Sequence, residues 1–236
     1  MSSSNSHPLK QPLLSIIIPV LNEATIIQSI LSRLQGNLAI EIIVVDGGSQ
    51  DNTFELAKAA GVKVIISLQQ GRANQMNAGA AIATGEILLF LHADTKLPPD
   101  YLNLIKVTLD RPKAIAGAFE LAIDDGRKTL RLVEFMVKYR SRWLSLPYGD
   151  QAIFLRKNVF ERVGGFADLP IMEDFEFVQR LKRQGKIAIA PAAVLTSSRR
   201  WQKLGVFKTT LVNQLVIIGY YLGVSPQRLR RFYNRQ

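Results

Sequence analysis

Asp46, His92 and Asp94 are the side chains of this 236-residue chain whose placement most directly suggests chemistry. Each follows a short, wholly apolar segment, as a polar group at the end of a buried strand would. A carboxylate there must be paired, solvated or bound to a ligand, because burying a lone charge is costly. Gly47-Gly48 allows a tight turn, and we expect Asp46 to face a crevice without a capping duty. Its oxygens could accept hydrogen bonds from a base or a ribose, which favours nucleotide binding.

Arg72 and Asp94 together suggest a site for a diphosphate and a cation. Arg72 follows Gly71 at the start of an expected helix, where free N–H groups favour anions; a plain surface arginine is the alternative interpretation. Asp94, beside a diphosphate, would hold Mg²⁺ or Mn²⁺ through its oxygens. His92 could be a second ligand for Mn²⁺ or a hydrogen-bonding residue in the wall of the site, and the sequence leaves both interpretations open.

Glu173 and Asp174 are candidates for acid–base chemistry because they open an expected helix after Pro170-Ile171-Met172. A hydroxyl group is a poor nucleophile until a base removes its proton. Neighbouring positions on a helix do not face each other, so the two acids would have different tasks. We assign the base to Asp174 and a supporting role to Glu173. The alternative is that one of them only stabilises the start of the helix.

Alternating apolar and amphipathic segments predict the elements that would position these residues. Four apolar runs predict parallel strands covered on both faces, and three helical patterns separate them. The strands are residues 15–20, 40–45, 62–67 and 87–91; the helices are 23–34, 51–60 and 73–84. Asn22 would cap the first helix and Glu23 would lie in its first turn. Ligands of such sheets bind beyond the carboxyl ends of the strands, where the polar residues fall.

The second half predicts further strands and helices without a linker that separates it from the first half. The strands are residues 114–123, 151–155 and 186–195, and the helices are 128–143 and 173–184. We therefore expect one α/β domain with a mixed, mainly parallel sheet flanked by helices. The expected boundaries are a disordered tail at 1–12, a nucleotide half at about 13–97, an acceptor half at about 98–202, and a C-terminal helical appendix at 203–236.

Composition and charge exclude several classes and point to a negative partner. The hydrophobic fraction of 47% is that of a globular protein, and the absence of cysteine excludes disulfides and thiolate metal sites. The net charge is +11, and residues 177–236 hold 12 basic and no acidic side chains. Such a segment implies phosphates, an anionic membrane or nucleic acid as partner, or only a solvated basic face. No signal peptide is visible at the N-terminus.

Residues 204–224 form a nearly uncharged segment that is a weak transmembrane candidate by length. Its apolar residues Leu204, Phe207, Leu211, Leu215, Ile218 and Leu222 fall on one arc of a helix, with Thr209, Thr210 and Asn213 opposite. We therefore expect a helix that packs on the domain or lies at a membrane interface.

Eight motifs, in order, resemble those of family 2 glycosyltransferases with the GT-A fold, over roughly residues 14–202. In the first half they are Pro19-x-x-Asn22-Glu23, Val45-Asp46-Gly47-Gly48-Ser-x-Asp51-x-Thr53, Gly71-Arg72 and His92-Ala93-Asp94. In the second half they are Gly149-Asp150-Gln151, Gly164-Gly165-Phe166, Met172-Glu173-Asp174 and Arg199-Arg200-Trp201. The residues of these motifs most resemble those of a small bacterial branch described as radical-SAM/selenodomain-associated transferases, some linked to arsenosugar biosynthesis.

The resemblance implies a role for each matching residue. Pro19, Glu23 and Ala93 would border the nucleotide, Asp46 would bind the base, and Arg72 would contact the nucleotide. Asp94 would be the metal ligand of the Asp-x-Asp motif, whose first position is His92 here. Asp174 matches the catalytic base. Acceptor or diphosphate contacts would come from Gly149, Asp150, Glu173, Arg200 and Trp201. The glutamine usual before the Arg-Trp pair is Ser197, so processivity is not inferred.

These observations predict an inverting, metal-assisted glycosyltransferase that uses Mg²⁺ or Mn²⁺ and a nucleotide sugar, UDP-linked rather than GDP-linked. The acceptor would be a small molecule or a lipid. A nucleotidyltransferase and a non-catalytic basic nucleic-acid-binding module are the alternatives, but no phosphate loop or aromatic-interleaved basic surface is visible. We expect no nucleic-acid partner, a cytoplasmic location with a peripheral position on the inner membrane as a second option, and a homo-oligomer as a further option.

Overall fold

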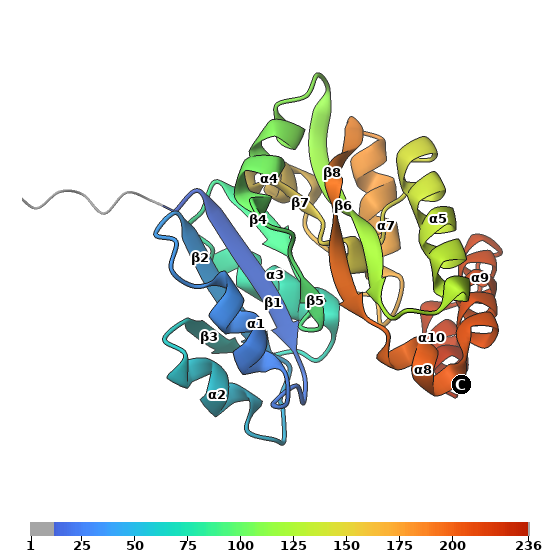
Figure 1. Cartoon of the computed structure of the whole chain (residues 1–236), viewed down its shortest axis with the longest axis horizontal. Helices are drawn as coiled ribbons and strands as arrows, with labels where there is room; N and C mark the ends of the chain where they lie inside the picture. The colour runs from blue at the N-terminus through green and yellow to red at the C-terminus, as the bar shows by residue number, and fades with distance from the viewer. Residues whose placement is uncertain (1–11, 236) are drawn as a thin grey trace, which may run out of the picture.

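A computed structural model describes residues 12–235 of the chain. Its strands form one eight-stranded sheet in the order β3-β2-β1-β4-β7-β6-β8-β5 (Figure 1). The strands are β1 Leu14–Val20, β2 Ile40–Asp46, β3 Lys63–Ile66, β4 Ile87–Phe90, β5 Thr95–Lys96, β6 Ala114–Asp124, β7 Phe154–Arg156 and β8 Lys186–Ser197. The predicted tail at 1–12 lies, apart from Pro12, outside the described residues.

The first half is the predicted parallel arrangement. β1 pairs in parallel with β2 and β4, and β2 pairs in parallel with β3, so the carboxyl ends of all four strands meet at one edge. β7 then joins β4 to β6 by antiparallel pairing, while β6 and β8 are parallel. The sheet is thus mixed and mainly parallel, which confirms the predicted fold class.

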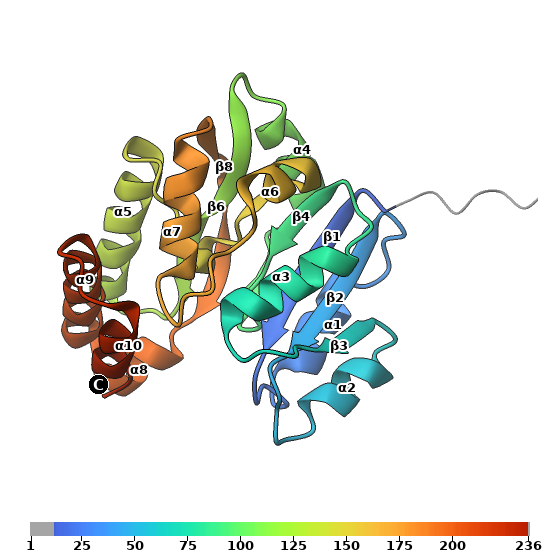
Figure 2. The same ribbon diagram turned by 180° about the vertical axis from the view of Figure 1, so that it is seen from behind.

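Helices cover both faces of the sheet, each over its own apolar core (Figures 1 and 2). One face carries α1 Ile27–Leu34, α2 Thr53–Ala59, α4 Tyr101–Leu109 and α5 Lys128–Trp143; the other carries α3 Arg72–Ile82, α6 Lys157–Val163 and α7 Glu173–Lys182. Alternate residues of β1 show the division, since Ile16 and Ile18 face the first core and Ile17 the second. α3 approaches the sheet closely at Gly79, where a Cβ would lie 2.5 Å from Ile17.

The C-terminal segment consists of three helices rather than one. α8 Arg199–Leu204 ends at Gly205, whose φ of 82° allows the chain to turn into α9 Val206–Tyr221, and α10 Pro226–Asn234 follows. Val216 and Leu229 pack with Met172 and Phe175 at the start of α7 in a third apolar cluster. Across residues 12–235, every helix falls short of the length and apolarity that crossing a bilayer requires.

Of the two orientations expected for the segment 204–224, the structure does not show the one in which the apolar arc packs on the domain. α9 packs through Thr209, Val212 and Val216, whereas Phe207 is 84% exposed and Leu211 and Ile218 are also exposed. Thr209 can be buried because its hydroxyl donates a hydrogen bond to the carbonyl of Gly205. The apolar arc of this helix therefore faces outward.

Candidate active site

Gln75 ties the ends of β1 and β2 together and shapes the floor of the site. Its side-chain amide donates to the carbonyls of Val20 and Val45, both at 2.8 Å. The N–H of Gly47 also donates to the carbonyl of Val20. A Cβ on Gly47 would lie 3.0 Å from the Gln75 side chain, so glycine lets the chain pass tightly over this amide. The two strand ends are held rigidly beside the cleft.

Asp46 stabilises the local backbone, which corrects the expectation that its side chain has no capping role. Its Oδ1 accepts hydrogen bonds from the N–H groups of Gly48 and Ser49, at 2.7 and 2.6 Å, and thereby closes the turn after β2. The side chain is only 2% exposed, and Oδ2 has no hydrogen-bond partner among the described residues. A buried carboxylate oxygen without a partner is costly, so Oδ2 keeps unused acceptor capacity directly before Gly47 and Gly48, which line the cleft.

Asn22 and Glu23 lie before α1 rather than in it, because that helix begins at Ile27. Asn22, with a φ of 55°, accepts a hydrogen bond from the N–H of Gln50, and the N–H of Glu23 donates to Thr53. These bonds join the loop after β1 to the loop after β2. The predicted cap at Asn22 is wrong, since its side chain binds the neighbouring loop.

A cleft of about 630 Å³ opens at the carboxyl ends of β1, β2 and β4. Six of the predicted site residues line it, namely Pro19, Glu23, Arg72, His92, Ala93 and Asp94. Asp46 does not line it, although Gly47 and Gly48 directly after Asp46 do. Arg199, from the start of α8, reaches toward the cleft and bridges Glu23 and Asp94, with both N···O distances at 3.3 Å. The position of the Arg199 guanidinium shows that Glu23 and Asp94 together form a binding site for a positive charge.

The donor set of this cleft suits a cation that is shared with a phosphate ligand. Within residues 12–235, no three His, Asp or Glu side chains gather closely enough to hold a metal ion by themselves. Mg²⁺ is commonly bound through only one or two carboxylates together with substrate phosphates and water. Asp94 and Glu23 fit that arrangement.

Arg72 and Glu173 form an ion pair between the cleft and the acceptor half. The Arg72 Nε lies 2.5 Å from Glu173 Oε1, and the Glu173 side chain is only 3% exposed. Burial raises the pKa of Glu173, and the positive charge of Arg72 opposes that rise. Glu173 therefore fixes Arg72 at the start of α3, where the helix already favours an anion.

His92 contacts Arg72 rather than a second acid. The Arg72 guanidinium lies 3.2 Å from His92 Nε2, and because arginine can only donate, this nitrogen must accept. Burial, and then the charge of Arg72, lower the pKa of His92 to about 4. A neutral imidazole whose free nitrogen is occupied by an arginine supports the interpretation of His92 as a wall residue.

This lowered pKa gives a prediction for stability. Because His92 takes up a proton more readily in the unfolded chain, wild-type protein should lose stability relative to His92→Asn as the pH falls from about 6.5 to about 4. Chemical denaturation at several pH values measures the difference, with His7→Asn as the matched control. If the difference in the free energy of unfolding between the wild type and His92→Asn did not change with pH, the lowered pKa of His92 would be contradicted.

Asp174 is held by two backbone N–H groups at the junction of α7 with the loop before β7. Its Oδ2 accepts from Gly149 and its Oδ1 from Phe175, both at 2.8 Å. A Cβ on Gly149 would lie 2.9 Å from Asp174 Oδ2 and 3.1 Å from His92 Nε2, so glycine keeps Asp174 and His92 close. The carboxylate is thus oriented beside Arg72 and His92.

A second cavity, of about 460 Å³, begins where the first ends. Arg72, His92, Pro170 and Arg230 line both cavities. Asp150 and Asp174 supply acidic groups to the second cavity, and Tyr148, Ile171, Phe175, Val216 and Ile217 supply apolar surface. Burial raises the pKa of Asp150 to about 6, against the opposing charge of Arg140. Two cavities that meet at Arg72 can hold two substrates side by side.

Arg200 and Trp201 are not brought to either of these cavities. Arg200 stacks on Tyr233 of α10, with its guanidinium carbon 3.7 Å from the ring centre, and Trp201 packs against the first apolar core. Arg199, one residue earlier, is the member of this motif that reaches the cleft. The residues that sequence reasoning missed are Arg199, Pro170 and Arg230, and only the basic character of the C-terminal quarter hinted at the two arginines.

Comparison with known proteins identifies this arrangement. The model of the glycosyl transferase family 2 matches residues 15–168. The PGL/p-HBAD biosynthesis glycosyltransferase of Mycobacterium bovis is 39% identical, over 86% of this chain and 82% of that protein. The undecaprenyl-phosphate 4-deoxy-4-formamido-L-arabinose transferase of Yersinia pestis is 26% identical over 67% of this chain, which spans about half, 52%, of that protein.

Glucosyl-3-phosphoglycerate synthase from Mycobacterium tuberculosis, solved with Mn²⁺, UDP and glucosyl-3-phosphoglycerate, has the same fold. It superposes with a TM-score of 0.61 at 19% identity, over 88% of this chain and 79% of that structure. The sheet and the helices that flank it therefore have the GT-A fold. The chain belongs to glycosyltransferase family 2 and is a glycosyltransferase enzyme. The nucleotidyltransferase and nucleic-acid-binding alternatives are set aside.

Proposed function

We propose that this enzyme moves a glycosyl group from a UDP-sugar to a hydroxyl group, with inversion and with the help of Mg²⁺ or Mn²⁺. The observation that carries the proposal is that Arg72 lies between two adjoining cavities and that Asp174 is oriented in the second. The donor would occupy the cleft at the strand ends and the acceptor the second cavity. The synthase neighbour, which is described with UDP and Mn²⁺, supports the choice of donor and cation.

On the donor side, the free oxygen of Asp46 would accept a hydrogen bond from the nucleoside, and Arg72 would contact the diphosphate. Asp94, with Glu23 nearby, would hold the cation together with the diphosphate oxygens. The cation, when bound, supplies positive charge that stabilises the leaving nucleoside diphosphate. Arg199 would exchange its contact with Asp94 for a contact with the anionic donor.

On the acceptor side, Asp174 would remove the proton of the attacking hydroxyl as the new bond forms at the anomeric carbon. The bond to the diphosphate breaks on the opposite face of the sugar, so a single displacement inverts the anomeric centre. The anomeric configuration of the product can be measured by NMR. A retained configuration would exclude the single displacement. Glu173 acts by holding Arg72.

The acceptor proposed here carries an apolar part beside its hydroxyl group, because tyrosine, isoleucine and phenylalanine side chains line much of the second cavity. The name of the Yersinia relative, which specifies undecaprenyl phosphate, supports a lipid acceptor. The motif resemblance to the radical-SAM/selenodomain-associated branch stays a hypothesis about the pathway.

Calorimetric titration of UDP tests the donor site. We expect Mn²⁺ to tighten UDP binding at least about tenfold, which corresponds to about 1.4 kcal/mol. Asp94→Asn should remove most of this gain, since it removes the charged ligand, whereas Asp110→Asn, at an exposed position after α4, should keep it. Equal effects of Mn²⁺ on the wild type and on Asp94→Asn would contradict the proposed site.

A further inference from the structure

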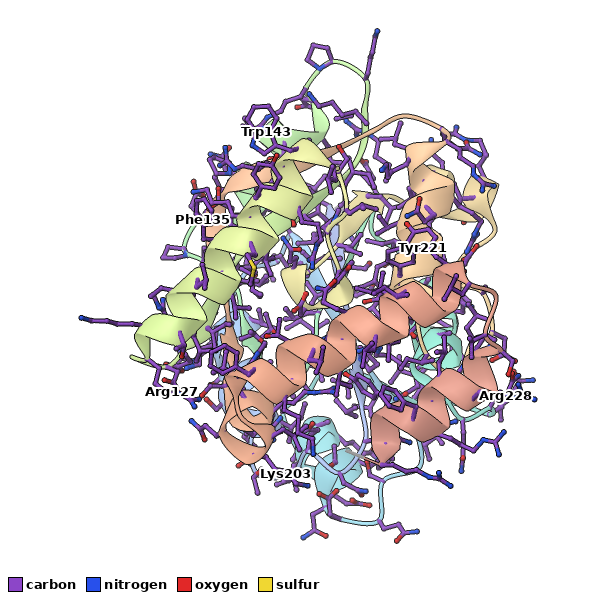
Figure 3. The ribbon with its side chains drawn as sticks, turned by 90° about the vertical axis from the view of Figure 1, so that its right-hand side faces the viewer. Arg127, Phe135, Trp143, Lys203, Tyr221 and Arg228 are labelled. Carbon is purple, nitrogen blue, oxygen red and sulfur yellow. The ribbon has the colours of Figure 1, made fainter. Side chains whose placement is uncertain are left out.

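α5 and α9 contact each other at one end of the molecule and expose apolar side chains along both helices (Figure 3). On α5 and directly after it these are Leu132, Phe135, Met136, Tyr139, Trp143 and Leu144; on α9 and directly after it they are Phe207, Leu211, Leu215, Ile218, Tyr221 and Leu222. We call these residues the two-helix patch. Figure 3 shows the two helices closest at their N-terminal ends and diverging toward Trp143 and Tyr221. Isolated exposed apolar residues are ordinary, but apolar stripes on two adjoining helices indicate an interaction surface.

The patch consists of two regular stripes. Leu132, Phe135, Met136, Tyr139 and Trp143 follow the spacing of one helix face, and so do the residues of α9 from Phe207 to Leu222. The opposite faces hold the helices on the domain, through Leu130 and Val133 on α5 and Val212 and Val216 on α9. Each helix is therefore anchored by one face and presents a second apolar face outward.

Basic side chains lie beside the α9 part of the patch (Figure 3). Lys203 lies near the end of α8, Lys208 at the start of α9, and Arg228 and Arg231 on the neighbouring α10. All four are exposed, and within residues 12–235 none of them pairs with a carboxylate. Trp143, which is 76% exposed, stacks on Tyr139 with the ring centres 6.1 Å apart. Exposed aromatic and aliphatic residues bordered by lysine and arginine are typical of helices that lie in a membrane interface.

We propose that the two-helix patch docks on an anionic membrane surface. The charge favours this occupant over a second copy of the chain, because pairing two such patches would bring like-charged rims together in a protein of net charge +11. Anionic lipids attract juxtamembrane lysine and arginine, and the apolar stripes then enter the headgroup region.

Docking in this orientation would place the acceptor cavity next to the lipid. Asn213, Val216 and Ile217 of α9 line that cavity, while Phe207, Leu211 and Ile218 of the same helix face outward. Only the width of α9, about 10 Å, then separates the cavity from the membrane. This last step rests on the proposed function, whereas the docking itself does not.

Sedimentation of the full chain with vesicles tests the proposal. We expect binding to equimolar phosphatidylglycerol–phosphatidylcholine vesicles and at least about tenfold weaker binding to phosphatidylcholine alone. The Trp143 fluorescence should shift to the blue on binding, and Trp143→Phe should bind but lose most of the shift. No binding to the anionic vesicles would overturn the proposal, even where UDP binding by the same preparation is intact.

Matched variants test whether the two-helix patch is the surface that binds the vesicles. The pairs Phe135→Ser with Trp143→Ser, Phe207→Ser with Leu211→Ser, and Lys203→Glu with Lys208→Glu should each weaken binding about tenfold or more. The pair Leu38→Ser with Leu68→Ser removes two apolar residues that are 98% and 102% exposed on the nucleotide half, and it should bind like the wild type.

Thermal unfolding and UDP titration confirm that each variant is folded. Equal binding by the patch and control variants would overturn the proposal. So would a wild-type dimer that the patch substitutions convert to a monomer without any vesicle binding, because the surface would then belong to a second copy of the chain.

Discussion

Replacing Asp174 with asparagine should lower the rate of glycosyl transfer about 10²- to 10⁴-fold, the usual contribution of a positioned base. The reason is that an amide cannot take the proton of the acceptor hydroxyl. UDP affinity should change little, since Asp174 lines the second cavity and not the first. Rates at saturating donor and acceptor, measured as UDP release, give the effect.

Stability is the necessary control for this variant, because both carboxylate oxygens of Asp174 accept backbone N–H groups. The amide nitrogen of asparagine cannot accept, so one N–H loses its partner at a cost of about 1–3 kcal/mol. Assays should therefore run well below the melting temperature of the variant. Glu161→Gln, at an exposed position on α6, is the matched control and should keep wild-type rates. A rate within tenfold of wild type for Asp174→Asn would refute the assignment of the base.

Replacing Arg72 with methionine should produce a loss of both activity and stability. Activity should fall about 10²- to 10³-fold, because a positive group that stabilises the leaving diphosphate is removed. Stability should fall by about 1–3 kcal/mol, because Glu173 stays buried without its cation. Denaturant unfolding and steady-state rates measure the two effects separately.

The double variant Arg72→Met with Glu173→Gln separates these causes. Removing the buried charge together with its partner should restore most of the stability but none of the activity. The sign of the pH effect adds a second check. Burial raises the pKa of Glu173, so its ionised form opposes folding, and the Arg72→Met variant should lose stability as the pH rises through that pKa. Restored activity in the double variant would show that Arg72 serves only to neutralise Glu173.

The strands β1 to β4 could be predicted to within about two residues, because each is a continuous apolar run of the kind that forms parallel strands, whereas the short strand β5 was not predicted. The start of α1 could not. The sequence Asn22-Glu23 suits a helix start, but Asn22 instead binds the loop after β2, a contact between segments far apart in the chain. A local sequence pattern predicts only contacts between near neighbours in the chain, such as a helix cap. It cannot predict the hydrogen bond that Asn22 forms with a distant loop.

The site shows the same limit. The sequence predicted that Asp94, Arg72 and Asp174 lie at the site, and they line the two cavities, because carboxylate and guanidinium groups at strand and helix ends have few purely structural explanations. Arg199 was not, since its partners Glu23 and Asp94 come from the other half of the chain. The periodicity of α9 revealed an amphipathic helix, but periodicity alone does not tell which face meets the domain.

Diffraction from crystals grown with UDP and Mn²⁺, recorded at the manganese absorption edge, would locate the cation and the diphosphate in the strand-end cleft. We expect an anomalous peak beside the Asp94 carboxylate, with the diphosphate between that peak and Arg72 and with Arg199 released from Asp94. Manganese and UDP bound away from the strand-end cleft, or a diphosphate out of reach of Arg72, would contradict the proposed donor site.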